Sequence, residues 1–484
     1  MKKLGSKKIL QWSTKDVALN VLTYVLNAVF ITALLLFTVS ANGKDIGEYF
    51  SNVTSFLHFA ILLMILVAIM AFYFAFEDRD FMKNSVNSEM LFLIVEVSLI
   101  ICLVVGRYVN IYLRPLSLVG ILTLFLTNRR TAIFMSTFFC LLMFLFDSFG
   151  AGQVYDLSNY PILIMGFTSG IIAIFCLDKV SSRLKLLFRG ALISIPTLVC
   201  VLMAVLEHGN DDVLVSLVSA GCSGPLSVAA FIILLPIFEA MFKKVSCFKL
   251  AELTDHKTKL IRRMIRYAPG TFNHSIVVSN IAEACATAIG EDAMLARTCA
   301  YYHDIGKLRR PEFFKENQAD GVNPHDDLTP ELSANIIKSH TQDGYQLIMK
   351  NRLPKDIADI CLQHHGTLPI LYFYDKARKF TDGEVDLAQY CYSGPKPQTK
   401  IAAIIMIADG CEAAARALVD RSRENVTKQV RKIVSERMEL GQFEECEITL
   451  KELNIIIHTV VNNLTGIYHN RIEYPKVNLE GMDL

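Results

Sequence analysis

The chain has 484 residues, of which 52% are hydrophobic, and its formal net charge is +1 at pH 7. Its mean hydropathy of +0.38 is too high for one soluble globule, so part of the chain is expected to lie in lipid. The small net charge argues against a protein that coats nucleic acid, because that mode of binding needs an excess of Lys and Arg on the phosphates. A nucleic-acid polymer is therefore not expected as a partner.

Long apolar runs fill the first half of the chain. A helix needs about 20 mainly apolar residues to span a bilayer, and eight runs come near this length. The fourth run is the weakest because Arg114 and Pro115 interrupt its start. The sequence therefore predicts a transmembrane module of about eight helices in residues 1–242, in contact with the lipid bilayer. The runs lie near residues 17–41, 54–76, 89–106, 111–127, 131–148, 160–177, 188–206 and 213–242.

The distribution of basic residues predicts the orientation of these helices. Short cytoplasmic loops retain Lys and Arg, whereas short external loops do not. If the N-terminus is cytoplasmic, the outer segments carry only Lys44, Arg107 and Arg114, and the inner segments carry the other basic residues of this half. An even number of spans then places the second half of the chain in the cytoplasm.

One carboxylate, Glu96, lies inside the third apolar run. An ionised carboxylate in lipid costs several kcal/mol unless it faces the interior of the bundle or is neutral. A ligand or proton site and a protonated structural Glu are both compatible with this position.

The second half of the chain has an amphipathic pattern typical of helices. Apolar residues recur at spacings of three and four in residues 274–289, 291–302, 355–364 and 400–418, and no sustained alternation predicts strands. We therefore expect an all-α fold: a polytopic transmembrane helical bundle, a cytoplasmic linker at 243–268, and an all-α domain at 269–484.

A set of His and Asp residues in this domain has the composition of a metal site. A helix bundle can bring such side chains together at its centre. Imidazole and carboxylate donors suit Mn²⁺, Fe or Zn²⁺ and argue against Ca²⁺ or Mg²⁺. Two metals bridged by the central carboxylate, Asp304, would activate water for hydrolysis of a phosphoester. The candidate ligands are His274, His303, Asp304, His340, His364, His365 and Asp409.

A single His is more often a hydrogen-bonded core residue than a metal ligand, and this alternative applies to His274 or His340 taken alone. The run Ile305-Gly306-Lys307 after the His303-Asp304 pair favours the metal site. Glycine permits close approach of the backbone, and lysine supplies a cation beside the centre.

At these residues the sequence resembles the HD-domain phosphohydrolase superfamily. It is more closely similar to the seven-transmembrane HD-hydrolase family of bacterial cyclic di-AMP phosphodiesterases, the PgpH-like family. The similar stretches occur in the same order and extend to GIYHNRIEYP at 466–475. They are PGTFNHS at 269–275, AYYHDIGK at 300–307, ENQADGVNPHDDL at 316–328, SANIIKSHTQDG at 333–344, QHHGT at 363–367 and GPKPQTKIAAIIMIADGCEAAARAL at 394–418.

The resemblance implies a multi-pass protein of the bacterial plasma membrane with a cytoplasmic catalytic domain. It implies two divalent transition metals, usually iron or manganese, and hydrolysis of cyclic di-AMP to linear pApA by a hydroxide that the two metals activate. One metal would be held by His274, His303, Asp304 and Asp409, and the other by Asp304, His340, His364 and His365.

Further roles are open at five residues. Lys307 is expected to stabilise charge on the phosphoryl oxygens beside Asp304, or else to serve as a structural ion-pair partner. Four residues in polar motifs flanking the site are candidates for substrate binding, with turn and capping roles as the alternative; they are Asn323, His325, Gln398 and Thr399.

Two departures from the family pattern bear on function. The family often has a second His where this chain has Asn273, which is expected to change only fine geometry. Many members carry a large extracellular domain between the first two spans, whereas here about a dozen residues, near 42–53, separate them. Either the chain is a naturally short member or the domain has been removed.

Two other functions are alternatives to this one. A cyclic di-GMP phosphodiesterase would have Gly-Tyr-Pro shortly after the paired His, but Gly366-Thr367-Leu368 follows here. A non-catalytic membrane receptor that binds nucleotide would not need a complete ligand set. A homodimer is a further option that the sequence leaves open.

Overall fold

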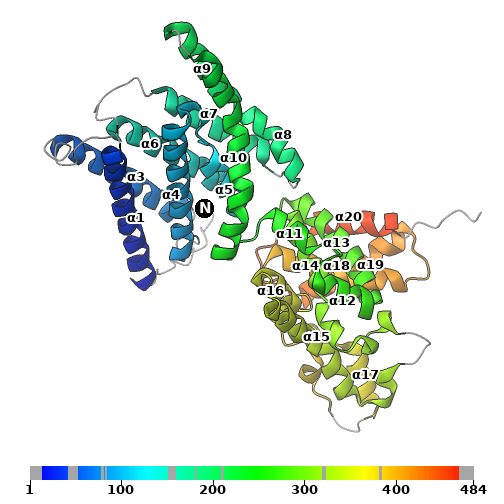
Figure 1. Cartoon of the computed structure of the whole chain (residues 1–484). Coiled ribbons are helices and arrows are strands. Elements are labelled where there is room, and N and C mark those ends of the chain that lie inside the picture. The colour runs from blue at the N-terminus through cyan, green and yellow to red at the C-terminus, as the bar shows by residue number, and fades with distance from the viewer. Residues whose placement is uncertain are drawn as a thin grey trace, which may run out of the picture. The chain divides into compact units, whose positions relative to one another are not determined.

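The structure is a computed structural model of the chain, and it divides into two compact units, Met1–Ser246 and Cys247–Leu484 (Figure 1). Within the described residues, the one β-type pairing is an isolated bridge between Pro369 and Cys391. The predicted all-α fold is therefore confirmed. The described residues are 14–41, 53–77, 81, 84–150, 160–178, 180, 182–208, 212–318, 323–380 and 384–467, so nearly all of the short loop expected near 42–53 lies outside them.

The first unit is a bundle of apolar helices, each of which corresponds to a predicted run. Six helices are long and apolar enough to cross a membrane, one of them formed by α8 and α9 together, and α7 and the segment Ile111–Leu126 are shorter. The chain is thus a multi-pass membrane protein, and the total of eight spans stays a prediction. The elements are α1 (Thr14–Ala41), α3 (Val53–Glu77), α4 (Ser85–Tyr108), η2 (Ile111–Leu113), α5 (Leu118–Leu126), α6 (Arg129–Gly150), α7 (Tyr160–Leu177), α8 (Arg183–Ile193), α9 (Ile195–His208) and α10 (Val213–Phe242).

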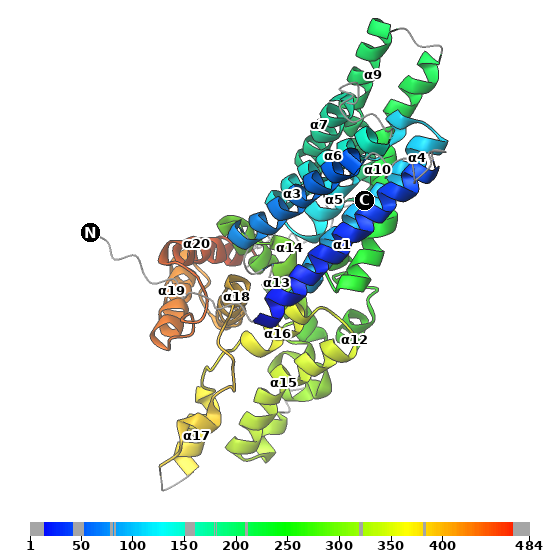
Figure 2. The ribbon, with the colours of Figure 1, turned by 90° about the vertical axis from the view of Figure 1, so that its left-hand side faces the viewer.

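The packing of this unit brings sequence-distant helices together. Helix α1 packs along α4, as Figure 2 shows, and α6 packs against α5 and α7. The fourth predicted run is split into η2 and the short helix α5, with Arg114 and Pro115 between them. Proline lacks an amide donor, and it disfavours helical conformation in the residue before it, so it separates the two elements.

A serine hydroxyl replaces a missing backbone hydrogen bond in α10. Pro225 cannot donate to the carbonyl of Gly221, four residues earlier in the helix. Ser194, at the junction of α8 and α9, donates its hydroxyl to that carbonyl at 2.8 Å and accepts from the Gly224 amide at 2.9 Å. A Cβ atom at Gly224 would lie 2.1 Å from the Gly190 carbonyl oxygen, so glycine allows the close approach that makes these bonds. The irregular backbone is thereby satisfied inside the bundle, as lipid requires.

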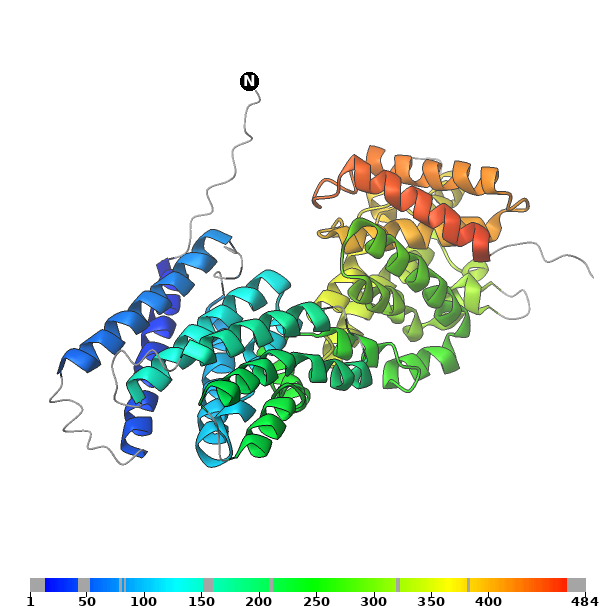
Figure 3. The same cartoon turned by 90° about the horizontal axis from the view of Figure 1, so that it is seen from above.

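The second unit is built around the central helix α13, which packs against α14, α18 and α20. The four amphipathic stretches of the sequence largely coincide with α13, α14, α16 and α18, and Figure 3 shows α19 and α20 running side by side. Its α-helices are α11 (Cys247–Leu253), α12 (Lys259–Tyr267), α13 (Pro269–Ile289), α14 (Ala293–Tyr302), α15 (Pro330–Lys350), α16 (Lys355–Gln363), α17 (Leu371–Phe380), α18 (Lys400–Ala417), α19 (Arg423–Glu439) and α20 (Leu450–Ile467). The 3-10 turns are η4 (Ile305–Arg309), η5 (Pro311–Phe313), η6 (Lys315–Asn317), η7 (Pro324–Asp327) and η8 (Leu387–Tyr390).

The segment 243–268, predicted to be a linker, contains α11 and α12. Both helices pack within the second unit, α11 against α14 and α12 against α13 and η4. The hydroxyl of Tyr302 donates to the Leu253 carbonyl at 2.7 Å, and that of Thr298 donates to the Leu250 carbonyl at 3.3 Å. These bonds hold α11 against α14, the helix whose C-terminus leads into His303 and Asp304.

The hydroxyl bridge in the first unit can be tested by Ser194→Ala. This change removes the hydroxyl that replaces the missing Pro225 donor at the Gly221 carbonyl in an apolar bundle, and we expect it to lower stability by about 1–2 kcal/mol. The measurement is thermal unfolding of the purified chain in detergent. Thr32→Ala is the control, because the Thr32 hydroxyl donates within its own helix to Ala28. Equal unfolding midpoints for the two variants would contradict this role of Ser194.

Candidate metal centre

All seven predicted ligands lie together in the second unit. They form three overlapping groups whose donor atoms lie within 4.8 Å of one another: Asp304 with His340, His364 and His365; His274 with His303 and Asp304; and His303 with His364 and Asp409. His274 comes from α13, His340 from α15 and Asp409 from α18.

The two adjacent pairs of ligands occur where helices end. His303 caps the C-terminus of α14 and Asp304 is the N-cap of η4, while His364 caps the C-terminus of α16 and His365 follows it. The sequence placed these pairs in or beside helical segments, and the structure places them at the ends. The change of direction at each helix end lets neighbouring residues face different parts of one cluster.

The carboxylate of Asp304 occupies the centre, and its two oxygens face different imidazoles. Oδ1 lies 3.3 Å from His340 Nε2 and 3.6 Å from His364 Nε2. Oδ2 lies 3.3 Å from His303 Nε2 and 3.8 Å from His274 Nε2. Asp304 is 2% exposed. A buried carboxylate that presents one oxygen to each of two nitrogen sets has the arrangement of a bridge between two cations.

The imidazole rings are oriented by the nitrogen that points away from the cluster. Nδ1 of His303 contacts the Ala300 carbonyl at 2.7 Å, and Nδ1 of His340 contacts the Ile337 carbonyl at 2.5 Å. Nδ1 of His364 contacts the Cys361 carbonyl at 3.0 Å. A carbonyl can only accept, so each ring carries a proton on Nδ1 and directs Nε2 inward, where the neutral ring offers a lone pair. This orientation is the usual one for a histidine that binds metal.

These lone pairs lack a protein donor. His340 Nε2 and His364 Nε2 lie 3.3 Å apart although each ring already donates through Nδ1, so neither can donate to the other. The Nε2 atom of His303 is buried and has no hydrogen-bond partner among the described residues. Buried polar atoms are normally satisfied, and a cation between these nitrogens would satisfy them. The donor set therefore fits a transition-metal site.

Charges around the cluster act in opposite directions on its imidazoles. Burial opposes the charged form of His303, but Asp304 and Asp409 outweigh it and raise the pKa of His303 to about 10. Burial alone would raise the pKa of Asp304, but Lys307 and His303 hold the pKa of this carboxyl well below its usual value. Burial lowers the pKa of His340 to about 3, and burial together with His364 holds the pKa of His365 well below its usual value. Metal binding requires an ionised carboxylate and neutral imidazoles, so Asp304, His340 and His365 need no proton loss at neutral pH, whereas His303 would release a proton.

Lys307 is held by two carboxylates. Its Nζ lies 2.7 Å from Asp304 Oδ2 and 2.9 Å from Glu316 Oε1. Burial opposes the charged amine, but Asp304 and Glu316 outweigh it and raise the pKa of Lys307 above its usual value. The geometry therefore matches the ion-pair alternative for Lys307, with Glu316 as a partner that sequence analysis did not identify.

A second residue missed by sequence analysis, Glu412, supports His274. Glu412 is fully buried, and its Oε2 lies 2.5 Å from His274 Nδ1. Arg416 binds the other carboxylate oxygen of Glu412. His274 Nε2 then lies 2.9 Å from Asp409 Oδ1. Glu412 follows Asp409 by three residues on α18, so it lies on the same helix face. That spacing is the signal that could have revealed it.

The four predicted substrate-binding residues have partners of their own. Asn323 accepts from the His325 amide at 3.3 Å and caps η7. His325 Nε2 lies 2.9 Å from the Phe313 carbonyl, and its ring packs beside Phe373. Thr399 caps α18 because its hydroxyl oxygen accepts from the backbone amide of Ala402. The backbone amide of Gln398 donates to the side-chain oxygen of Gln363. The contacts of Asn323 and Thr399 are capping contacts, and those of His325 and Gln398 join residues that are distant in sequence. The substrate-binding role of these four residues stays a prediction.

A glycine sets the distance between two of the ligand-bearing elements. A Cβ atom at Gly306 would lie 1.9 Å from the His340 carbonyl oxygen and 2.5 Å from the Gly344 amide nitrogen. The backbone of η4 therefore contacts the backbone of α15 directly, as the close approach predicted for this glycine requires. The contact brings Asp304 and His340 to the same side of the cluster.

The least buried part of the cluster is formed by His365 and Asp409. Their side chains are 22% and 13% exposed, against 7% or less for the other five candidate ligands. Tyr392 stacks on His365 with ring centroids 4.4 Å apart. A molecule from solvent would therefore reach the cluster beside His365, Asp409 and Tyr392.

Two family descriptions match the two halves of the chain. Residues 53–246 match "7TM receptor with intracellular HD hydrolase", and residues 271–414 match "HD domain". The second match contains all seven residues of the cluster, and such a domain with this His and Asp set binds divalent metal.

Curated proteins and solved structures give similar matches. The chain is 37% identical over 427 residues to the cyclic-di-AMP phosphodiesterase PgpH of Bacillus subtilis, covering 86% of this chain and 59% of that protein. It is 42% identical over 318 residues to PgpH of Listeria monocytogenes, covering 65% and 44%. A crystal structure of the L. monocytogenes PgpH HD domain in complex with cyclic-di-AMP is 49% identical, with a TM-score of 0.43, covering 45% of this chain and 100% of that one.

The chain spans about half the length of the curated relatives that it matches. Within that length, the membrane segment and the HD segment occur in the order of the two family descriptions. The chain belongs to the family of 7TM proteins with an HD hydrolase domain.

Proposed function

We propose that this chain is a metal-dependent phosphodiesterase of the bacterial plasma membrane that hydrolyses cyclic di-AMP to linear pApA. The observation that carries the proposal is the central carboxylate of Asp304, whose two oxygens face two separate sets of inward-directed imidazole nitrogens. One divalent cation would be held by His274, His303, Asp304 and Asp409. The other would be held by Asp304, His340, His364 and His365.

Donor chemistry supports manganese or iron at both positions. Each set combines imidazole nitrogen with carboxylate oxygen, which suits these ions better than calcium or magnesium. Two such ions, when bound, lower the pKa of a water molecule and neutralise charge on the phosphoryl oxygens.

The charge balance of the site suits an anionic substrate. Glu316 pairs with Lys307, and Glu412 pairs with Arg416, so Asp304 and Asp409 supply the net negative charge of the cluster. Two divalent cations exceed these two carboxylates in charge. The loaded site is therefore positive, and it attracts a phosphodiester.

The protein residues have separate tasks in this reaction. Asp304 would hold both cations, one through each carboxylate oxygen, and Lys307 fixes one oxygen of Asp304 through an ion pair. The more exposed face at His365 and Asp409 admits the phosphodiester, and Tyr392 offers an aromatic ring beside it. The polar residues Asn323, His325, Gln398 and Thr399 stay candidates for binding the nucleoside parts of the substrate.

The substrate and the location are supported by the relatives and by charge. The two curated relatives described above are named cyclic-di-AMP phosphodiesterases. The bias of Lys and Arg among the membrane loops favours a cytoplasmic second unit, where a nucleotide second messenger would be found. A homodimer stays a prediction, and light scattering of the purified chain would test it.

Hydrolysis is tested with the full chain in detergent, with Mn²⁺ and three substrates: cyclic di-AMP, cyclic di-GMP and a generic phosphodiester. We expect cyclic di-AMP to be hydrolysed fastest, with pApA as the product. Turnover of none of the three would reject the enzyme, and preference for cyclic di-GMP would reject only the substrate. Activity should be lost on chelation and return with Mn²⁺.

Replacement of the bridging carboxylate gives a second test. Asp304→Ala removes an oxygen ligand from both cation positions, so we expect turnover to fall below detection while the helical circular dichroism is kept. The control is Asp356→Ala, because Asp356 is an exposed acid in the first turn of α16. Full activity of the Asp304 variant would refute a bridge at this position.

The support of His274 by Glu412 gives a third test, which does not depend on activity. Glu412→Gln removes the negative charge that holds the proton on His274 Nδ1. Loss of such a partner typically lowers metal affinity by about 10–100-fold, and we expect a decrease in this range. Mn²⁺ binding is measured by competition with a chelator, with the exposed Glu424→Gln as control. Unchanged affinity would show that Glu412 has only a packing role.

A further inference from the structure

Helix α12 of the second unit has an exposed face that carries only positive charge. The segment 256–268, which contains this helix, has no Asp or Glu. Successive residues of an α-helix are about 100° apart around its axis, which places the basic residues of α12 within one arc of about 100°. All of them are exposed, and they form what we call the cationic face: Lys259, Arg262, Arg263 and Arg266.

The opposite side of α12 fixes the direction of the cationic face. Leu260, Ile261 and Met264 are each 2% exposed or less. The helix packs against α13 and η4 of the same unit. Because these apolar side chains are held in the core, the cationic face is directed outward as a fixed surface rather than as a mobile segment.

Two exposed side chains with apolar groups border the cationic face. Ile265 is 39% exposed and Tyr267 is 57% exposed, and the helical spacing puts one on each side of the basic residues. Tyrosine is enriched where a protein meets the headgroups of a bilayer, because its ring is apolar and its hydroxyl is polar. A basic face with such neighbours is typical of a helix that lies on a membrane surface.

The four cations have no counter-charge among the described residues. None of Lys259, Arg262, Arg263 and Arg266 forms an ion pair or a side-chain hydrogen bond with any residue that the structure describes. Other basic residues at the surface of the second unit do form ion pairs: Lys355 with Asp359, Lys379 with Asp375 and Arg309 with Asp343. The charge of the cationic face is therefore available to a ligand.

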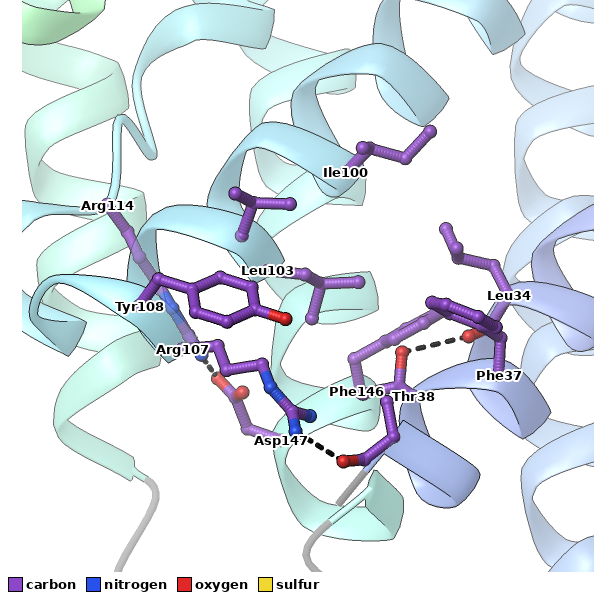
Figure 4. A pocket seen from close by; sticks show the side chains of 13 residues that line it. Leu34, Phe37, Thr38, Ile100, Leu103, Arg107, Tyr108, Arg114, Phe146 and Asp147 are labelled. Carbon is purple, nitrogen blue, oxygen red and sulfur yellow. Dashed lines mark hydrogen bonds and ion pairs between the residues drawn. The ribbon is translucent and has the colours of Figure 1, made fainter. Parts of the chain in front are cut away.

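The membrane unit shows the opposite pattern at three arginines. In the pocket of Figure 4, Arg114 Nη1 lies 2.6 Å from Asp147 Oδ2, and both side chains are largely buried. At the start of α6, Arg129 and Arg130 lie within 4 Å of carboxylates from other parts of this unit. A carboxylate of the chain thus accompanies each of these three arginines, whereas the cationic face of α12 has none.

The chain connects α12 to a helix that can cross the bilayer. Helix α10 is long and apolar enough to span a membrane, and it ends at Phe242. Only residues 243–258 separate this end from α12. A cluster of four or more basic residues shortly after a span is typical of a segment that binds anionic lipid headgroups.

We propose that the cationic face of α12 binds the anionic headgroups of the bilayer that the chain spans, with Ile265 and Tyr267 at the level of the headgroups. The inference is independent of the proposed hydrolase activity, because none of these residues belongs to the metal cluster. It assigns an anionic lipid surface as a partner of the second unit.

The test uses the full chain in lipid vesicles, with one tryptophan as a reporter on α12. The chain has a single tryptophan, Trp12, so Trp12→Phe together with Tyr267→Trp leaves one indole, beside the cationic face. Its fluorescence is measured in vesicles of phosphatidylcholine alone and in vesicles that also contain phosphatidylglycerol, each with a lipid that carries a nitroxide quencher on its headgroup. We expect strong quenching with phosphatidylglycerol and weak quenching without it.

A double variant of the reporter chain tests the role of charge. Arg262→Gln with Arg266→Gln removes two cations from the face. One basic residue near an anionic surface favours contact roughly fivefold, so the ratio of contacting to non-contacting chains should fall roughly 25-fold. The matched control is Lys428→Gln with Arg431→Gln, which removes two exposed cations from α19 and should leave the quenching unchanged.

Salt provides a second measurement, which needs no change in α12 beyond the reporter. A salt concentration of about 1 M screens charges at an exposed surface, so it should reduce the quenching that depends on phosphatidylglycerol. This measurement tests the proposal even if the double variant does not fold.

The outcomes are distinct. Quenching that requires phosphatidylglycerol and falls both in the double variant and at high salt supports the proposal. Equal quenching in the two kinds of vesicle overturns it, and so does quenching that neither the double variant nor salt reduces. Absence of quenching in both kinds of vesicle would also overturn it, and it would leave a soluble acidic partner as the ligand of this face.

Discussion

The second unit depends on the burial of one charged group, the carboxylate of Asp304. It is 2% exposed, and it lies among imidazoles from α13, α15 and the ends of α14 and α16. A buried charge is costly unless it is paired, so each of these elements must stay close enough to satisfy it. The requirement for a paired carboxylate thus couples helices that are far apart in sequence into one arrangement.

The backbone supports this arrangement as much as the side chains do. The Nδ1 atoms of His303, His340 and His364 are each bound to a carbonyl of their own helix. These carbonyls fix both the tautomer and the direction of each ring. His274 differs, because a carboxylate, Glu412, has this task. Its ring is therefore the one whose orientation depends on a charged side chain.

Sequence analysis predicted the seven residues of the cluster together but not all of the residues that support them. The seven candidate ligands belong to ordered motifs, and pattern and resemblance both pointed to them. Glu316 and Glu412 are acidic residues without a distinctive motif, and only the folded chain brings them to Lys307 and His274. In the membrane unit, hydropathy predicted the apolar helices that the structure describes. It carries no information on the hydrogen bond from the Ser194 hydroxyl to the Gly221 carbonyl of α10.

The contact at Gly306 has a further consequence for the precision of the site. The backbone of η4 rests on the His340 carbonyl and the Gly344 amide without an intervening side chain. Side chains can change rotamer, whereas main-chain atoms in van der Waals contact have no such freedom. The spacing between Asp304 and His340 is therefore limited by direct contact between two stretches of main chain. Thermal motion of side chains in the surrounding core changes this spacing little.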